Sequence, residues 1–560
     1  MHVPIKFVSI ALTMFMLYGC GGGDSSTSMN GKTAGSNEYP VDIEEVVKVV
    51  DWRKYSTTSV ALSGRITYDL VPPNTNHIGL DYRAIKKEPS KWVDVRIIAK
   101  NGDVFGHTFT DENGNYHFNE LPSAKDVKIQ VRAKMLHAGT PSWKVEVLDN
   151  TNLGKNNKAA LYVMQGDVFS TGENNSTHDL HAESGWVNGR GYTSIRAAAP
   201  FAILDTIQSA MKKVLSAEKN ASFPPLQVFW SKKNTRANGE VKYGQIGTSY
   251  YQNRKLYILG DDVLDTDEYD THIIAHEWGH YYEDTFSRSD SIGGSHDPKE
   301  KLDIRLAFSE GWGNAFSAMA LDDPIYFDTG TPLAGNGFLM NMEDRQTGRH
   351  EKVDGWFSEA SIQHILYDIY DSHSDGPDTV SLGFAPIHEV MTHAQKHTQA
   401  FTSLFPFILG IQKLNPEVSM QINNLLDDES INPIMDIWGK GNSENPYKIF
   451  SMGKQSNFVF DYTNGTIDRN KLGNHLYYKF TIDTSAYYMI SVKGANGTDP
   501  DFTLYGSKGS SALKFLDRVY KDNGNIESKN KLLEAGQYIL DINDFNQKTG
   551  AQFTLNITPQ

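Results

Sequence analysis

His276-Glu277-Trp278-Gly279-His280 is the stretch that decides the fold of this chain. Two histidines at positions i and i+4 lie on one face of a helix, about 6 Å apart along its axis, so both imidazoles can converge on one cation. Glu277 lies beside them, where its carboxylate can take a proton from water held at that cation. The spacing predicts a helix over residues 267–284 in which His276 and His280 bind zinc and Glu277 is the general base.

A zinc site of this kind needs a third protein ligand and leaves its fourth position open to water. Residues 307–316 read Ala-Phe-Ser-Glu-Gly-Trp-Gly-Asn-Ala-Phe and are expected to be helical. This block resembles the second zinc helix of gluzincins, above all of fungalysins, whose pattern is Gly-Glu-Gly-Trp-Ser-Asp. The resemblance implies that Glu310 is the third zinc ligand. It also implies that Asn314 replaces the family's Asp and accepts a hydrogen bond from Nδ1 of His276.

The segment before the first helix supports the same resemblance. Residues 246–251 and 255–259 are expected to form two strands, and thermolysin-like enzymes have at this position an edge strand that pairs with the extended substrate backbone. The metzincin subclass is excluded, because Glu283 and Phe286 stand where it requires Gly and His. We therefore expect an α+β zincin-type metallopeptidase domain over residues 156–440.

Other polar residues near the motif are assigned structural roles. His272 would lie about 12 Å from His280 along the helix, too far to share an ion, so it is expected to be a packing or surface residue. His296 follows a glycine-rich loop and is expected to be structural. A calcium site is possible but lacks the Asp-x-Asp-x-Asp-Gly spacing, so a solvated loop is favoured for the acidic residues Asp261, Asp262, Asp265, Asp267 and Asp270.

A donor for the developing oxyanion is also required. Fungalysins have a Val-His-x-Ile-Gly-Glu pattern at the relevant place, whereas residues 354–359 of this chain contain no histidine. His364 and Tyr367 share one face of the helix that follows and are both candidates. A polar outer helix face explains them equally well, so this role is left unassigned.

The N-terminus reads as an export signal. Residues 7–18 are an apolar run long enough for a signal-peptide core but short for a membrane span. Leu17-Tyr18-Gly19-Cys20 resembles the bacterial lipobox, which implies a lipoprotein signal over residues 1–19, lipid attachment at Cys20 and delivery to the outer membrane or cell surface. An ordinary cleaved signal is the alternative. Cys20 is the only cysteine, so no intramolecular disulfide forms. Residues 20–55 are expected to be a flexible tether.

Two β-sandwiches are expected to flank the central domain. Val95, Ile97 and Ala99 alternate with polar residues before an Asn-Gly turn. Residues 56–145 resemble the carboxypeptidase regulatory-like, transthyretin-type sandwich through the stretches 63–66 and 110–116. Residues 446–560 resemble the prepeptidase C-terminal sandwich through the stretches 499–505 and 535–540.

Length and charge limit the possible functions. A chain of 560 residues is too long for one core, and its net charge of -15 argues against binding nucleic acid. The predicted function is a zinc endopeptidase with one zinc ion per chain, acting on extracellular proteins and bound to a membrane through Cys20. Two alternatives stay open: a non-enzymatic adhesin or binding lipoprotein with a decayed peptidase domain, and a zinc hydrolase acting on a non-peptide amide. No pattern indicates an oligomeric state.

Overall fold

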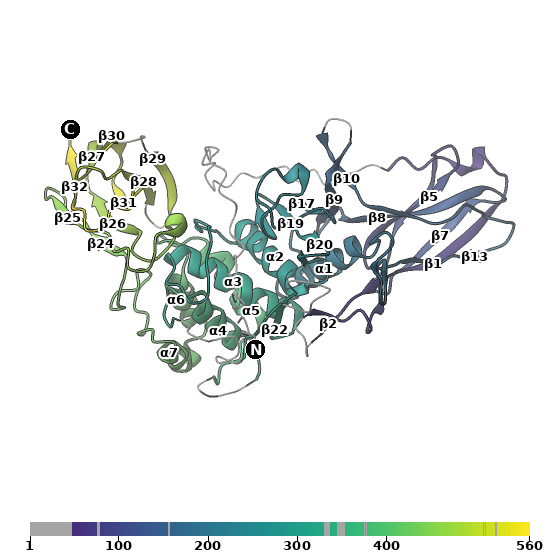
Figure 1. The fold of residues 1–560 in the computed structure, drawn as a ribbon, viewed down its shortest axis with the longest axis horizontal. Coiled ribbons are helices and arrows are strands. Elements are labelled where there is room, and N and C mark those ends of the chain that lie inside the picture. Colours follow the sequence, from purple (N-terminus) through teal and green to yellow (C-terminus); the bar gives the residue numbers. More distant parts are fainter. Residues whose placement is uncertain are drawn as a thin grey trace, which may run out of the picture.

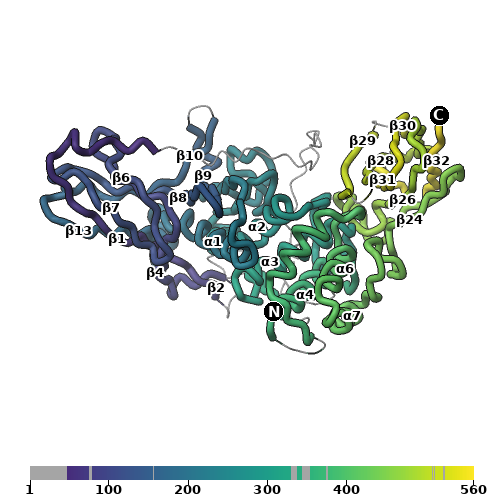
Figure 2. The backbone as a smooth tube through the Cα atoms, turned by 180° about the vertical axis from the view of Figure 1, so that it is seen from behind, coloured from purple at the N-terminus to yellow at the C-terminus, as the bar shows by residue number. Residues whose placement is uncertain are grey.

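The computed structural model describes residues 47–74, 79–154, 157–329, 337–343, 353–373, 376, 378–507, 509, 511–520 and 524–560. Sheets lie at the two ends of an elongated molecule, and helices fill its middle (Figure 1). The reverse view shows the same arrangement (Figure 2). The chain is thus multidomain, with β-rich regions around a helical one. The predicted signal segment 1–19, Cys20 and residues 20–46 of the predicted tether lie outside the described residues.

The N-terminal region is built almost entirely from strands. Val93–Ala99 pairs antiparallel with Val104–Phe109 across Gly102, whose φ of 91° suits the predicted Asn-Gly turn. The predicted strand and its Asn-Gly turn are therefore confirmed, although Asp94 and Arg96 are buried as well as the apolar residues. The strands are β1 (Ser59–Leu70), β2 (Pro73–Asn74), β3 (Gly79–Leu80), β4 (Lys86–Pro89), β5 (Val93–Ala99), β6 (Val104–Phe109), β7 (Asn115–Pro122), β8 (Asp126–His137), β9 (Trp143–Leu153), β10 (Ala159–Leu161), β11 (Val163–Gln165), β12 (Phe169–Ser170), β13 (Ser176–Thr177), β14 (Leu180–Ala182), β15 (Trp186–Val187) and β16 (Gly191–Tyr192).

The central region combines helices with a few strands. Its strands are β17 (Leu226–Trp230), β18 (Tyr250–Gln252), β19 (Lys255–Ile258), β20 (Gly260–Asp261), β21 (Asp265–Thr266), β22 (Ile325–Asp328) and β23 (Phe338–Asn341). Its helices are α1 (Ala199–Ala217), α2 (Thr271–Phe286), α3 (Ile304–Leu321), α4 (Glu359–Tyr370), α5 (Phe384–Val390), α6 (Leu404–Leu414) and α7 (Ser419–Asp428). Among the described residues, no helix is long and apolar enough to cross a membrane.

One sheet continues from the N-terminal region into the central region. Its strand order is β18-β19-β17-β9-β8-β5-β6. Strand β9 is antiparallel to β8 on one side and parallel to β17 on the other. The sequence predicts that the N-terminal sandwich ends at residue 145 and that the peptidase domain begins at residue 156. Residue 145 lies inside β9, and residue 156 follows β9 in the sequence, so the shared sheet crosses the predicted boundary. Pairing with β17 gives partners to backbone groups that an open edge would leave unpaired. The buried apolar residues of both regions likewise form one core.

Helix α2 begins later than the sequence pattern predicts. The expected start was residue 267, but the backbone N–H of Asp267 donates to the carbonyl of Leu259, so the chain there still belongs to the β20–β21 hairpin. The helix starts at Thr271, after Asp270. Helix α3 includes the whole predicted stretch 307–316 and extends it at both ends.

Helices α2 and α3 approach closely because glycines lie where they cross. A Cβ atom on Gly279 of α2 would come 3.2 Å from Cα of Gly313 of α3. A Cβ atom on Gly313 would come 2.8 Å from the ring of His276. Larger residues at these positions would push the helices apart, so the glycines set the distance between the two helices that carry the motif.

The C-terminal region is a sandwich of two sheets with its own apolar core. The sheet orders are β24-β26-β31-β28-β29 and β25-β32-β27-β30. The strands expected from the alternation around Tyr478, Ile490 and Leu540 are confirmed as β26, β27 and β31. The full set is β24 (Tyr447–Ile449), β25 (Ser456–Phe458), β26 (His475–Ile482), β27 (Ala486–Gly494), β28 (Pro500–Ser507), β29 (Lys514–Val519), β30 (Ile526–Leu533), β31 (Gly536–Asp544) and β32 (Phe553–Pro559).

Candidate metal centre

Three side chains from α2 and α3 meet at one point. Nε2 of His276 lies 3.1 Å from Nε2 of His280, and Oε2 of Glu310 lies 3.3 Å and 3.5 Å from these two atoms. Zinc bonds of about 2.0–2.1 Å in a tetrahedral site place neighbouring ligand atoms roughly 3.3 Å apart. The structure therefore brings together the three predicted ligands at spacings that suit a zinc ion.

Asn314 orients the ring of His276. Its Oδ1 lies 2.8 Å from Nδ1 of His276, and its Nδ2 donates to Oε1 of Gln363 at 2.8 Å. The bond to Gln363 fixes the amide so that its oxygen faces the histidine. Nδ1 of His276 therefore carries the ring proton, and the Nε2 lone pair points into the cluster. Asn314 thus lies where the fungalysin resemblance predicts.

Ser309 plays the corresponding part for His280. The hydroxyl of Ser309 donates its hydrogen to Oε2 of Glu283 at 2.6 Å. The Oγ atom of Ser309 can therefore accept a hydrogen bond from Nδ1 of His280 at 3.3 Å. The Nε2 lone pair of His280 then also points into the cluster. Two lone pairs 3.1 Å apart repel one another unless a cation or a proton lies between them. The orientation of both rings is thus the one that a metal requires.

The charges around the cluster agree with this arrangement. Burial opposes ionisation of Glu310, but the imidazoles of His296 and His280 outweigh it and hold the pKa of Glu310 well below its ordinary value. Burial likewise opposes the charged form of His280, yet the carboxylate of Glu310 raises the pKa of His280 to about 9. The buried carboxylate of Glu310 is therefore ionised, and a buried negative charge is stable only beside a positive one.

Glu277 lies next to this cluster in the sequence and in space. It follows His276 on α2 and is 0% exposed. Its negative charge is one of the causes that raise the pKa of His280. A buried carboxylate beside two imidazoles is a suitable proton acceptor.

Two residues of this site were missed by the sequence reasoning. His296 was expected to be a structural loop residue, but it is 6% exposed and its Nε2 lies 3.3 Å from Oε2 of Glu310. The same nitrogen lies 3.4 Å from Oε2 of Glu359, the first residue of α4. Burial raises the pKa of Glu359 to about 7. No local sequence pattern connects His296, Glu310 and Glu359, because a loop, α3 and α4 supply them.

The remaining candidates lie as follows. His272 is buried on α2, and its Nε2 lies 3.0 Å from the carbonyl oxygen of Asp323, in keeping with a packing role. His364 and Tyr367 are buried on α4, so the interpretation as a polar outer face is wrong. Nδ1 of His364 lies 2.7 Å from the carbonyl oxygen of Met342.

The acidic stretch before α2 is folded rather than solvated. Asp265, Asp267 and Asp270 are buried, which corrects the expectation of a solvated loop. The cause is the β20–β21 hairpin, which brings Asp265 and Asp267 close to Asp328 at the end of β22. One oxygen of each of these three carboxylates lies within 4.8 Å of the other two. Arg236 lies beside this group, with its Nε 3.5 Å from Oδ2 of Asp265.

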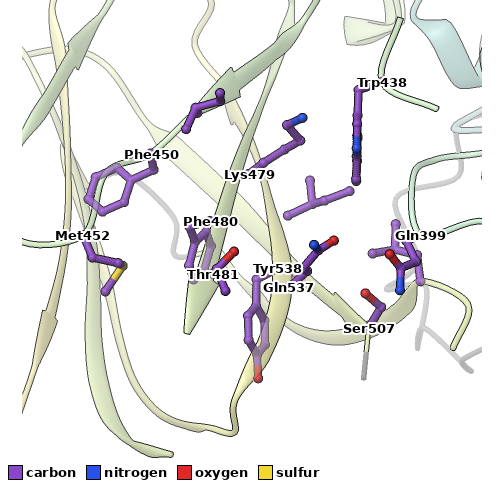
Figure 3. Close-up of a pocket in the computed structure, with 13 residues that line it drawn as sticks. Gln399, Trp438, Phe450, Met452, Lys479, Phe480, Thr481, Ser507, Gln537 and Tyr538 are labelled. Atoms are coloured by element: carbon purple, nitrogen blue, oxygen red, sulfur yellow. The ribbon is translucent and has the colours of Figure 1, made fainter. Parts of the chain in front are cut away.

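A cavity of about 360 Å³ lies apart from the metal centre. Residues of the C-terminal sandwich, including Lys479 and Tyr538, line it together with Trp438 (Figure 3). Nζ of Lys479 lies 4.1 Å from the centre of the Trp438 ring, a cation–π contact. Its lining residues include no member of the His276–Glu310 cluster, so this cavity is separate from the proposed chemistry.

Comparison with protein families finds a match within the central region. Residues 213–406 match the Mycolysin C-terminal domain, and this segment includes α2 and α3 with His276, His280 and Glu310. The match relates the chain to secreted peptidases. No curated protein matches the chain.

Among the solved structures that resemble part of this chain are small domains that cover a fifth of it or less. The pre-peptidase C-terminal domain of a collagenase from Bacillus anthracis shares 13% identity, covering 20% of this chain and 94% of that one, with a TM-score of 0.16. A mitogen from Yersinia pseudotuberculosis shares 15% identity over 16% of this chain and 86% of its own, with a TM-score of 0.12. A periplasmic inhibitor of g-type lysozyme from Aeromonas hydrophila shares 14% identity over 20% and 99%, with a TM-score of 0.12.

Proposed function

We propose that this protein is a secreted zinc-dependent endopeptidase of the gluzincin type that hydrolyses peptide bonds of extracellular proteins. The observation that carries the proposal is the meeting of His276 Nε2, His280 Nε2 and Glu310 Oε2 at 3.1–3.5 Å from one another. These three residues would hold one zinc ion per chain. The match of residues 213–406 to a peptidase-associated family supports the same assignment.

Each residue of the site then has a defined task. Zinc held there would polarise a peptide carbonyl and make water a stronger acid. The carboxylate of Glu277 accepts the proton that water loses and passes it to the leaving amine. Asn314 and Ser309 keep Nδ1 of the two histidines engaged, so that each Nε2 is free to bind the metal.

The sheet edge beside α2 supports the choice of an extended peptide as substrate. Among the described residues, strand β18 is the last strand of the ten-stranded sheet and pairs with β19 on one side only. The hydroxyl of Tyr251 in β18 donates to Asp284 of α2 at 2.6 Å, which holds this edge against the helix that carries the motif. The backbone groups on the outer side of β18 can pair with an extended peptide, as in other proteins that bind peptides by adding a strand to a sheet.

The N-terminal sequence supports a location outside the cytoplasm for the proposed enzyme. The apolar run 7–18 and Cys20 are proposed to export the chain and to anchor it by a lipid to the outer membrane or cell surface. The sequence of the following segment, rich in Gly and Ser, is suited to a tether between that anchor and the folded part.

Zinc content tests the ligand set. Purified protein should contain about one zinc ion per chain, and His276→Ala or Glu310→Ala should abolish it. His272→Ala is the matched control, since it removes a buried histidine one turn earlier on α2 and should leave zinc content unchanged. Full zinc retention in Glu310→Ala would show that the third ligand lies elsewhere.

Hydrolysis of casein tests the catalytic role. Glu277→Gln keeps the shape of the side chain and removes the base, so zinc content and fold should persist while the rate falls at least about a hundredfold. A chelator should stop the wild-type reaction, and added zinc should restore it. Equal activity of Glu277→Gln and wild type would refute the assignment. If neither protein cleaves any peptide in a library although zinc is bound, the binding-lipoprotein alternative is the better one.

A further inference from the structure

The loop that carries His296 is held by the C-terminal sandwich region. The amide of Asn470 donates to the carbonyl oxygens of Gly293 at 2.9 Å and Ser295 at 3.1 Å. The ammonium of Lys471 donates to the same Ser295 carbonyl at 2.6 Å, and the backbone N–H of Ser295 donates to Asp468 at 2.6 Å. Four hydrogen bonds from three residues thus fix the short segment that ends at His296.

The same contact continues to the start of α3. The backbone N–H of Asp303 donates to the carbonyl of Asn470 at 2.8 Å, and that of Leu472 donates to Lys301 at 2.8 Å. Lys471 is 1% exposed and also pairs with Glu300 at 2.8 Å. Residues 468–472 therefore run beside the connection that joins the two helices of the metal centre. A buried ammonium with defined partners is costly to displace, so this contact is specific rather than incidental.

His296 transmits this contact to the metal centre. Its Nδ1 lies 3.2 Å from the carbonyl of Gly294, and its Nε2 lies 3.3 Å from Oε2 of Glu310. Oε2 is the oxygen of Glu310 that also faces His276 and His280, and in the described part of the chain this buried atom accepts no hydrogen bond. Within the described residues, the group of ligand atoms that lie within 4.8 Å of one another comprises His276, His280 and Glu310 and does not extend to His296. His296 is thus placed to act on Glu310 rather than to replace a ligand.

We propose that the C-terminal sandwich helps to form the metal centre. Residues 468–471 hold the loop 293–296, and His296 in that loop positions the carboxylate of Glu310 for zinc. This inference rests on the proposed zinc site. It assigns the sandwich an activating role within the chain, so that release of the sandwich lowers zinc affinity. His296 is a positioning residue, because it reaches the metal through Glu310.

The experiment measures zinc affinity by competition with a chromophoric chelator, in the full chain. His296→Gln and Lys471→Met should each weaken zinc binding by about 10–100-fold, the range found when a residue that orients a metal ligand is lost. Because both act through one loop, the double variant should bind zinc about as weakly as the weaker-binding single variant. Lys531→Met is the matched control: it removes a sandwich lysine that pairs with Asp517 at 2.7 Å, and its zinc affinity should equal that of wild type.

Two further measurements guard against a merely structural effect. Asp468→Ala changes an exposed side chain and should weaken zinc binding several-fold through the lost bond to Ser295, and since Asp468 has a φ of 53°, its unfolding is measured beside that of wild type. The visible spectrum of the cobalt-substituted protein should change in His296→Gln and in Lys471→Met, since the orientation of Glu310 alters the ligand field, but not in Lys531→Met.

The outcomes separate this inference from the proposed function. Wild-type zinc affinity and an unchanged cobalt spectrum in Lys471→Met and Asp468→Ala would overturn the inference while leaving the zinc site intact. Full additivity of His296→Gln and Lys471→Met would also overturn it, because it would show that the two residues act independently. A wild-type protein that binds no zinc would instead overturn the proposed function.

Discussion

Replacing Asp541 by Asn tests whether the C-terminal sandwich and α3 fold as one unit. Arg305, in the first turn of α3, is 1% exposed and lies between two carboxylates. Its Nε donates to Asp303 at 2.9 Å, and its Nη1 donates to Asp541 of β31 at 2.9 Å. The second oxygen of Asp541 lies 2.6 Å from Nδ1 of His475. An amide at position 541 has one acceptor oxygen, so either Arg305 or His475 is left without its partner.

The expected loss is large enough to measure. A buried donor left unpaired costs about 1–3 kcal/mol, and removing one partner of a buried ion pair costs about 3–5 kcal/mol. Because Asp303 still neutralises Arg305, we expect Asp541→Asn to lower the free energy of unfolding by about 3 kcal/mol. For a cooperative unit of about 150–250 residues, calorimetry should show a fall in Tm of about 6–12 °C.

The control and the pH dependence make this prediction specific. Asp517→Asn breaks a more exposed pair with Lys531 and should cost less than about 1 kcal/mol. Burial opposes ionisation of Asp541, but His475 and Arg305 outweigh it and hold its pKa well below the ordinary value. Its stabilising contribution is therefore present above about pH 4 and is lost as the pH falls toward the depressed pKa. The reasoning is refuted if Asp541→Asn and Asp517→Asn have the same Tm at pH 7.

Three other predictions follow from the structure and the sequence. Gly313→Ala should weaken zinc binding about tenfold or more in a competition titration, since the new Cβ would come 2.8 Å from the His276 ring, and unchanged affinity would contradict this packing argument. Burial and the charge of Asp267 raise the pKa of Asp328 to about 7, so the contribution of Asp328 to the stability of wild type should fall as the pH rises from about 4 to 7. In urea denaturation at pH 8 without calcium, the free energy of unfolding of Asp328→Asn should exceed that of wild type by about 2 kcal/mol. A value below that of wild type would contradict this reasoning. Cys20→Ser should abolish palmitate labelling, and persistent labelling would exclude lipid attachment at Cys20.

Much of the candidate site was predictable from local sequence. The i, i+4 spacing of His276 and His280 specifies a shared face as soon as the segment is helical, because helix geometry depends only on neighbouring residues. The resemblance of residues 307–316 to a known zinc helix identified Glu310 and Asn314 in the same way. Strands with clear alternation, such as β5 and β26, were predictable for the same local reason.

Only the tertiary structure decided which distant segments meet. The sharing of one sheet by β9 and β17, and the burial of Asp267 beside Asp328, depend on contacts between residues more than fifty positions apart. His296 lies beside Glu310, in a loop whose carbonyl groups accept hydrogen bonds from Asn470 and Lys471. The physical reason is that hydrophobic periodicity and helix propensity are local properties, whereas the pairing of loops and sheet edges depends on how whole elements pack. From the sequence by itself, the three proposed ligands and the base could be read; their surroundings could not.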